Sequence, residues 1–345
     1  MSQTAMLFFS AVIAMGAAGA LIFLAYKNEL SRVCTDASRG ARIAETTAGP
    51  IEYAEKGAGI PLLSIHGAGG GYDQGLATVT DLVSVDFRVI APSRFGYLGT
   101  PIPSDTSSAS QADAHAALLT ELKVDKAIVV GISAGARSAV QLALRHSERV
   151  SALILIVPGT YAPASPVAVQ GTRMSALVLW LVNSGADFAW WATEKIAPSI
   201  LIRFIGVRPE LFASSPQAEQ NRVMQVVKSI EPLSRRFLGI NVDSHADIIR
   251  PPFEYIKVPS LIISAHDDLF NTLPAAEFAA STIPNAKLVV YDTGGHLLVG
   301  RQQQVRTIIG DFLARQVLWG GPPKVECMTP TTGVKSSSPS RNGNR

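Results

Sequence analysis

Short apolar runs alternate with longer stretches of helical periodicity along most of the chain. The runs, rich in Val, Ile and Leu, are residues 62–65, 87–91, 127–130, 152–157, 258–264 and 287–291. Glycine, proline or polar residues flank them, and apolar positions between them recur at helical spacing, for example over 109–122. This alternation predicts an α/β fold with a mostly parallel central sheet and helices on both faces. Residues 51–54 are predicted to begin the sheet.

The alternation stops between residues 158 and 252, where no strand pattern occurs. Two apolar stretches of helical spacing lie there, 174–182 and 188–207. The first is too short to cross a membrane, and the second carries charges and Pro198. We therefore expect a helical insertion over residues 159–252.

The insertion is rich in large aromatic side chains. They include Trp180, Trp190, Trp191 and Phe204. Since few charges accompany them, a substrate bound there is predicted to be small to medium-sized and largely apolar. For any single one of these residues, ordinary packing is the simpler interpretation.

The amino-terminal region has a different pattern. Residues 5–26 form an apolar run of 22 positions without a charge, which as a helix matches a hydrocarbon core of about 30 Å. A cleaved signal peptide is the alternative, but no Lys or Arg precedes the run, and the small residues Ala18, Gly19 and Ala20 lie inside it. We expect residues 1–27 to be a membrane anchor, with the lipid bilayer as a partner.

Basic residues are distributed unequally around this segment. None precedes it, whereas Lys27, Arg32, Arg39 and Arg42 follow it. Because cytoplasmic flanks carry the excess of Lys and Arg, the rest of the chain is predicted to face the cytoplasm. Export, which would follow if the segment were a signal, is the alternative.

Charge and composition bear on the class of function and on the bounds of the remaining segments. The 345 residues carry a formal net charge of +3, and the basic residues are scattered, so nucleic-acid binding is not expected. Residues 28–50 are predicted to be a juxtamembrane linker, and 318–345 a disordered tail rich in Gly, Pro, Ser and Thr. Cys34 and Cys327 fit no metal-ligand spacing; a disulfide between them is conceivable, but two separate thiols are favoured.

The candidate chemistry centres on residues 126–137, KAIVVGISAGAR, an apolar run that meets Gly-Ile-Ser-Ala-Gly and passes into a helical stretch. A serine hydroxyl is a weak nucleophile and must project from a fixed backbone toward a base, with donors ready for the oxyanion. Glycines two positions before and after Ser133 permit a sharp turn. Composition alone would produce this motif about one time in eight, so a structural turn serine is the alternative until the context is considered.

Three other strand ends supply that context. Residues 61–71 read PLLSIHGAGGG, 259–268 read PSLIISAHDD, and 287–296 read KLVVYDTGGH. A glycine loop, a serine, two acids and a histidine thus follow predicted strands. Over roughly residues 51–317 the chain resembles the α/β-hydrolases, whose triad follows the order Ser, Asp, His. The resemblance implies a core formed by 51–158 and 253–317, with 159–252 as a helical cap over the active site.

The resemblance also implies roles for the triad. Ser133 would be the nucleophile and His296 the base. Asp267 and Asp268 are adjacent, so their side chains point in different directions and one reaches the histidine. The family places its acid three residues after a small residue that ends the strand; Ala265 has that position, which favours Asp268 over Asp267. This acid would hold the imidazole tautomer.

The oxyanion donors implied by the family are backbone amides. Ala134, directly after the nucleophile, would supply one, and Ala68 or Gly69 in the glycine loop the other. No cofactor is expected.

The other histidines have simpler interpretations. For His115, His146 and His245, solvation is the simplest account, and for His66, at a strand end, a structural hydrogen bond is favoured over proton transfer. No pair of histidines has metal-ligand spacing on one element, so no metal site is predicted.

The predicted function is hydrolysis of a small or medium-sized apolar acyl or aryl ester through an acyl-enzyme. The serine argues against relatives with an aspartate nucleophile. Other serine members of the family cleave C–C bonds, amides or lactones, or transfer acyl groups, and these remain alternatives. A non-catalytic member that binds a small molecule is the rival from another class.

Overall fold

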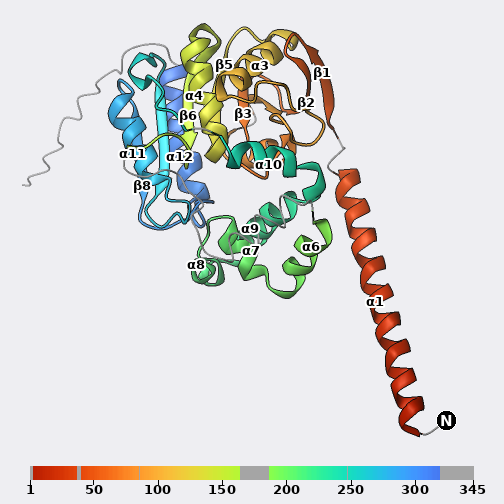
Figure 1. Cartoon of the computed structure of the whole chain (residues 1–345). Coiled ribbons are helices and arrows are strands. Elements are labelled where there is room, and N and C mark those ends of the chain that lie inside the picture. Colours follow the sequence, from red (N-terminus) through yellow and green to blue (C-terminus); the bar gives the residue numbers. More distant parts are fainter. Residues whose placement is uncertain (1–2, 37–39, 85, 164–185, 247, 319–345) are drawn as a thin grey trace, which may run out of the picture.

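A mixed eight-stranded sheet forms the centre of the molecule (Figure 1). The computed structural model describes residues 3–36, 40–84, 86–163, 186–246 and 248–318. The strand order is β1-β2-β4-β3-β5-β6-β7-β8, with β2 antiparallel to both β1 and β4 and all other pairs parallel. This confirms the prediction of a mostly parallel α/β sheet.

Eight strands form the sheet, and all but the first coincide with a stretch that the sequence predicts as strand. They are β1 (Arg42–Thr46), β2 (Gly49–Lys56), β3 (Ile60–Ile65), β4 (Phe87–Pro92), β5 (Ala127–Ile132), β6 (Val150–Ile156), β7 (Ser260–Ala265) and β8 (Lys287–Tyr291). The central strands are buried on both faces, which explains why their sequences are continuously apolar rather than alternating.

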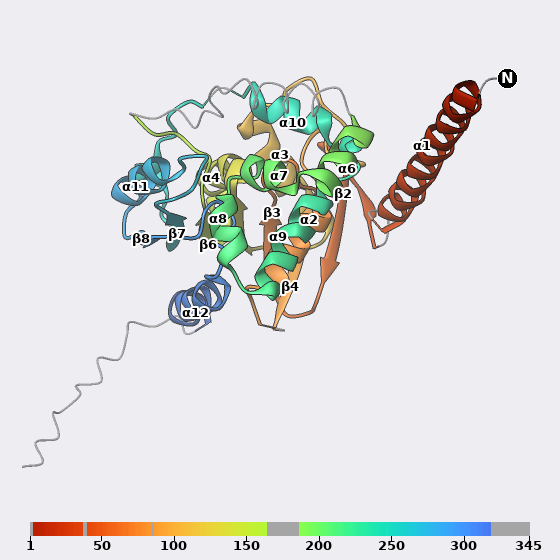
Figure 2. The same cartoon turned by 90° about the horizontal axis from the view of Figure 1, so that it is seen from below.

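Helices cover both faces of the sheet (Figures 1 and 2). They are α2 (Tyr72–Thr80), α3 (Ser108–Glu121), α4 (Ala136–Arg145), α11 (Leu273–Thr282) and α12 (Gln302–Leu313). Because side chains alternate along a strand, Val129 joins one hydrophobic core together with α3, α4 and α11, whereas Ile128 and Val130 join the other with α2 and α12. The short helices η2 (Ser147–Arg149), η4 (Phe253–Tyr255) and η5 (Ala314–Leu318) complete this part.

Helices occupy the described part of the connection between β6 and β7, and no strand occurs in it. They are α6 (Asp187–Ile196), α7 (Pro198–Phe204), α8 (Pro209–Ser214), α9 (Gln217–Ser229), η3 (Leu233–Arg235) and α10 (Phe237–Ser244). They share a small core that includes Trp190, Leu201 and Val227. The single stretch expected over 188–207 is two helices, because Pro198 cannot continue α6 and instead begins α7. The stretch 174–182 lies outside the described residues.

The helix α1 (Gln3–Asp36) is the one helix in the described residues with the length and hydropathy to cross a membrane. It projects from the rest of the molecule (Figure 1). The prediction of a linker over 28–50 is wrong, since α1 continues to Asp36 and residues Arg42–Thr46 form β1. In β1 only Ala44 is buried, so this edge strand has almost no apolar signal. Residues 319–345 of the predicted tail lie outside the described residues.

Candidate active site

The motif around Ser133 forms a tight turn between β5 and α4. Ser133 opens the 3-10 helix η1 (Ser133–Gly135) with a φ of 49°, a backbone conformation that costs energy for a residue with a side chain. A Cβ added at Gly131 would lie 2.6 Å from the Ala139 Cβ, and one at Gly135 would lie 2.4 Å from the His66 carbonyl oxygen. Both glycines are therefore needed because neighbouring segments approach closely.

The structure brings Ser133, His296 and Asp268 together. The Ser133 hydroxyl lies 2.9 Å from His296 Nε2, and His296 Nδ1 lies 2.9 Å from Asp268 Oδ2. The other carboxylate oxygen accepts a 2.9 Å hydrogen bond from the Phe270 amide, and the Thr272 hydroxyl donates to Oδ2. A nucleophile, a base and an acid that orients the base are thus joined in one hydrogen-bonded chain.

Charge and hydrogen bonding keep Asp268 ionised. Burial opposes ionisation of this carboxyl, but the His296 charge and the hydrogen bonds from His296, Thr272 and Phe270 outweigh it, so the pKa of Asp268 lies below its ordinary value. An ionised Asp268 accepts from His296 Nδ1–H and leaves Nε2 facing Ser133 as the proton acceptor.

The neighbouring acid has a different position. Asp267 Oδ1 accepts hydrogen bonds from the amides of Gly294 and Gly295 at 2.8 and 2.7 Å. These glycines form the turn that leads into His296, so Asp267 fixes the loop rather than the imidazole. Of the two adjacent acids, Asp268 is the one that contacts the histidine.

The glycine loop after β3 lies against the nucleophile. A Cβ at Gly67 would be 3.0 Å from the Ser133 Cβ. Ala68 and Gly69 both line the cavity that contains Ser133, but the Gly69 amide donates to the Tyr97 hydroxyl at 3.2 Å. Between the two residues considered for the second oxyanion donor, the geometry favours Ala68, because the Gly69 amide is already engaged. Ala134 lines the same cavity.

His66 is a structural residue beside this loop. The Arg94 amide donates to its Nε2 at 3.0 Å, and its Nδ1 lies 2.7 Å from the Gly67 carbonyl oxygen, so Nδ1 carries the proton. Burial, together with the Arg94 charge, holds the pKa of His66 well below its ordinary value. The expectation of a structural hydrogen bond is confirmed.

The expectation of a solvated His115 is wrong. This residue is fully buried, with Nε2 3.2 Å from the Ser138 hydroxyl, and burial lowers its pKa to about 3. It belongs to the inward face of α3, with Ala112 and Leu119 three positions before and four after it. His245 is exposed, and His146 is half-buried beside Asp113.

A buried ionic network beside the site has no local sequence signal. Arg94 donates two hydrogen bonds to Asp243, at 2.8 and 2.6 Å, and Tyr97 donates a third to the same carboxylate at 2.6 Å. Burial opposes ionisation of Asp243, but the Arg94 charge outweighs it and lowers the pKa of Asp243 to about 2. Through Tyr97 the network reaches Gly69 of the glycine loop. Arg94 and Asp243 are 149 positions apart, so spacing alone could not pair them.

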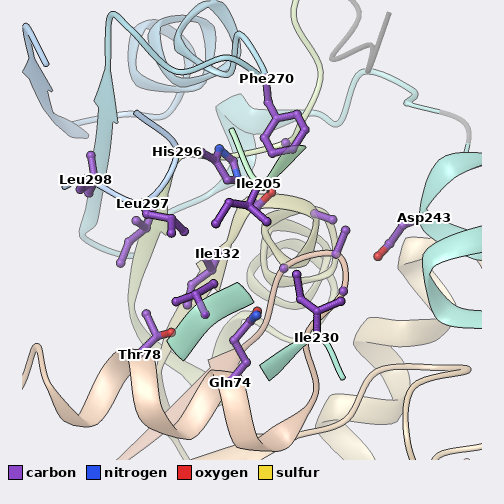
Figure 3. A pocket seen from close by; sticks show the side chains of 18 of the residues that line it. Gln74, Thr78, Ile132, Ile205, Ile230, Asp243, Phe270, His296, Leu297 and Leu298 are labelled. Carbon is purple, nitrogen blue, oxygen red and sulfur yellow. Dashed lines mark hydrogen bonds between the residues drawn. The ribbon is translucent and has the colours of Figure 1, made fainter. Parts of the chain in front are cut away.

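A cavity of about 500 Å³ adjoins Ser133 and His296 (Figure 3). Its walls are mainly apolar, from the sheet side, from the helical insertion and from the loop after β8. They include Ile132, Ile156, Phe204, Ile205, Ile230, Ile240, Leu297 and Leu298. Polar groups lie among them, notably Gln74, Thr78 and Arg137. In the described part of the chain, no group of three or more His, Cys, Asp or Glu residues could hold a metal ion.

The aromatic residues of the insertion are mostly not part of this cavity. Phe204 lines it, but Trp190 packs in the core of the insertion and Trp191 contacts α1. Trp180 lies outside the described residues. The apolar character of the cavity therefore comes mainly from aliphatic side chains.

Comparisons with known proteins agree with this architecture. The sequence profile of a family described as "alpha/beta hydrolase fold" matches residues 60–300. A pimeloyl-[acyl-carrier protein] methyl ester esterase of Aromatoleum aromaticum is 29% identical over 68% of this chain and 90% of its own length. A 2-hydroxymuconate semialdehyde hydrolase of Pseudomonas putida is 25% identical over 75% of this chain and 89% of its own.

Among solved structures, an alpha/beta hydrolase fold protein from Nakamurella multipartita is similar. It superposes with a TM-score of 0.59 and 26% sequence identity, covering 79% of this chain and 98% of its own.

Proposed function

The chain belongs to the α/β-hydrolase fold family, and we propose that it cleaves carboxylic esters through a covalent acyl-enzyme. The observation that carries the proposal is the hydrogen-bonded chain from Ser133 through His296 to Asp268, which opens on a largely apolar cavity. The chain is a hydrolase by its relatives, and this geometry supports acyl transfer to serine as its chemistry.

In the proposed mechanism, His296 Nε2 takes the proton of Ser133 as its oxygen attacks the ester carbonyl. The backbone amides of Ala134 and Ala68 stabilise the oxyanion. His296 then protonates the leaving alcohol, and a water molecule, activated by the same histidine, releases the acid from Ser133. Asp268 remains ionised and stabilises the imidazolium.

The proposed substrate is a small or medium-sized apolar ester. A cavity of about 500 Å³ is of the size that holds such molecules, and its aliphatic lining offers them more contacts than it offers a highly charged compound. The named relatives act on a methyl ester in one case and on a semialdehyde in the other. Hydrolysis of C–C bonds, amides or lactones and acyl transfer therefore stay as alternatives, and a ligand-binding protein without catalysis is the rival class.

A series of p-nitrophenyl esters of graded chain length tests the proposal. We expect the wild-type chain to hydrolyse them with an optimum among short and medium acyl groups, and Ser133→Ala to be inactive. Ser133 should also react with a fluorophosphonate probe. An unlabelled serine and no turnover of any ester would favour the ligand-binding alternative, and a clear preference for highly charged substrates would contradict the substrate class.

We further propose that residues 5–26 of α1 anchor the chain in a lipid bilayer. In support, every residue from 3 to 25 is exposed, and the run contains no charge. An exposed apolar surface of this length is costly in water and stable in hydrocarbon.

A further inference from the structure

The exposed apolar surface of α1 ends at one residue, Tyr26. Residues 3–25 are exposed, whereas Tyr26 is only 9% exposed. The apolar run of residues 5–26 would extend about 33 Å as a helix, close to the thickness of a hydrocarbon core. If α1 spans a bilayer, Tyr26 therefore marks the level at which the helix leaves the hydrocarbon.

At this level α1 packs against α6. The Tyr26 ring lies edge-on to Phe188, with centroids 5.2 Å apart, and 5.7 Å from the Trp191 ring. One turn further along α1, Glu29 accepts a 2.7 Å hydrogen bond from Trp191 Nε1 and forms a 2.9 Å ion pair with Lys195. We call these five residues the α1–α6 junction. It holds α6 at the end of the apolar segment.

The side of α6 that faces away from the insertion core carries exposed apolar groups. Phe188 is 46% exposed and Ile196, two helical turns later, is 83% exposed, with Lys195 between them in sequence. Trp190 and Glu194, on the opposite side, are buried. Nothing in the described residues explains why a large aliphatic side chain such as Ile196 projects outward from this helix.

We propose that the outer side of α6 lies in the headgroup region of the same bilayer that α1 crosses. This inference rests on the proposed anchor and adds a second membrane contact, made by the helical insertion. Tyr and Trp side chains favour the level between hydrocarbon and water, and that is where the α1–α6 junction places Tyr26 and Trp191. Ile196, directly after Lys195, would lie at the headgroup level, where Lys195 is paired with Glu29.

Site-specific fluorescence quenching tests the proposal on the full chain. In a background of Cys34→Ser and Cys327→Ser, single cysteines replace Ile196, Leu21 in the apolar segment, or Tyr255 in η4, and each receives the same fluorophore. Tyr255 is 68% exposed, and its short helix η4 packs with α4 and α11, which lie away from α1 and α6 in Figure 1, so it is the matched control. The labelled chains are reconstituted in vesicles of phosphatidylcholine and phosphatidylglycerol.

Two quenchers report the environment of each label. Lipid with a spin label near the headgroup end of its acyl chain should quench position 196 several-fold more than position 255, and aqueous iodide should show the reverse order. Position 21 should be shielded from iodide. This combination supports the second membrane contact.

Three other outcomes overturn it. Position 196 behaving like position 255 while 21 is in lipid would leave the anchor and remove the contact of α6. Position 196 shielded from both quenchers would mean that a protein surface, from a second copy or another partner, covers α6. Position 21 open to iodide would remove the anchor and the contact together. Ester turnover by the labelled chains is measured separately, so loss of the proposed catalytic function would be distinguished from all three.

Discussion

His296 is the residue through which the candidate site is assembled. Its ring joins Ser133 to Asp268 and packs nearly perpendicular to the Phe270 ring, with centroids 4.6 Å apart. Its amide donates to the Gly206 carbonyl oxygen of the helical insertion at 3.1 Å. The imidazole is thus held both by its hydrogen bonds and by packing, and little reorganisation is needed before proton transfer.

The first prediction concerns the nucleophile and the base. Ser133→Ala and His296→Ala should each lower kcat for a p-nitrophenyl ester by several orders of magnitude. The double variant should be little slower than either, because the two residues act as a unit and the amides of the oxyanion site remain. Steady-state kinetics measure this, and multiplicative losses in the double variant would contradict the mechanism.

The second prediction separates the two adjacent acids. Asp268→Asn should lower kcat strongly, because an amide in that position favours the wrong imidazole tautomer. Asp267→Asn should cost much less, since its remaining carbonyl oxygen still accepts from the Gly294 and Gly295 amides. The pair serves as its own control in the same assay. A larger loss from Asp267→Asn would transfer the orienting role to that residue.

Individual residues of the site could be predicted from the sequence where a local motif or a nearby strand identifies them. Ser133 lies in a motif defined by close packing of Gly131 and Gly135. Asp268 and His296 lie three and five positions after the ends of β7 and β8. Tyr97 and Asp243 have no such signal, because their contacts depend on how a loop and the insertion meet in three dimensions. His115 was misjudged since a polar residue on an inward helix face looks solvated from the sequence alone.

Between elements, the Arg94–Asp243 pair connects the loop after β4 to α10. Both side chains are 8% exposed, so neither charge has access to much water. Removal of one partner of a buried ion pair leaves the other charge uncompensated, which commonly costs about 3–5 kcal/mol.

The third prediction follows from this connection. Asp243→Asn should lower the free energy of unfolding by about that amount at pH 7, in denaturant titrations of the chain in detergent. Asp113→Asn is the matched control, because its ion pair with Arg145 is about half exposed and should contribute at most about 1 kcal/mol. If both variants lowered the free energy of unfolding equally, the buried pair would contribute no more to stability than the exposed one.

The pH dependence of stability gives the same pair a second test. The pKa of Asp243 is lowered to about 2, against about 4 in an unfolded chain. Because the pKa of Asp243 is lower in the folded state, its ionised carboxylate stabilises that state at pH values above the pKa of the unfolded chain. This contribution is lost as the pH falls from about 4 toward 2. The wild-type chain should therefore lose stability over that interval, and Asp243→Asn should lose less. Parallel curves would contradict the assignment.

Helices and strands could be predicted where the burial of their side chains produces a clear pattern of apolar residues in the sequence. The central strands are buried on both faces and appear as unbroken apolar runs. The end of α1, residues 27–36, was not predicted, because this segment is mostly polar and only a stripe at helical spacing packs. That stripe is Tyr26, Glu29, Leu30, Val33 and Cys34. The edge strand β1 was missed because its backbone pairs with β2 while most of its side chains face solvent.

In the whole molecule, the helical insertion contacts both α1 and the cavity that adjoins Ser133. The proposed anchor α1 packs on α6 of the insertion, and the insertion in turn contributes Phe204, Ile205 and Ile230 to the wall of the catalytic cavity. The anchor therefore contacts the same insertion that forms part of the cavity wall. Either membrane face is compatible with this arrangement, so orientation has to be argued from charge.

The last prediction concerns that orientation. No basic residue precedes the apolar segment, whereas Lys27, Arg32, Arg39 and Arg42 follow it within about 20 residues, the range over which such charges determine topology. The catalytic part should therefore lie in the cytoplasm. Residues 1–50, which include all four basic side chains, can be fused to a reporter active only in the cytoplasm or to one active only after export. We expect activity in the cytoplasmic fusion, and a fourfold substitution of these residues by Gln should weaken that preference. Activity confined to the exported fusion would reverse the orientation, and absence of the apolar segment from the mature chain would show that it is a cleaved signal.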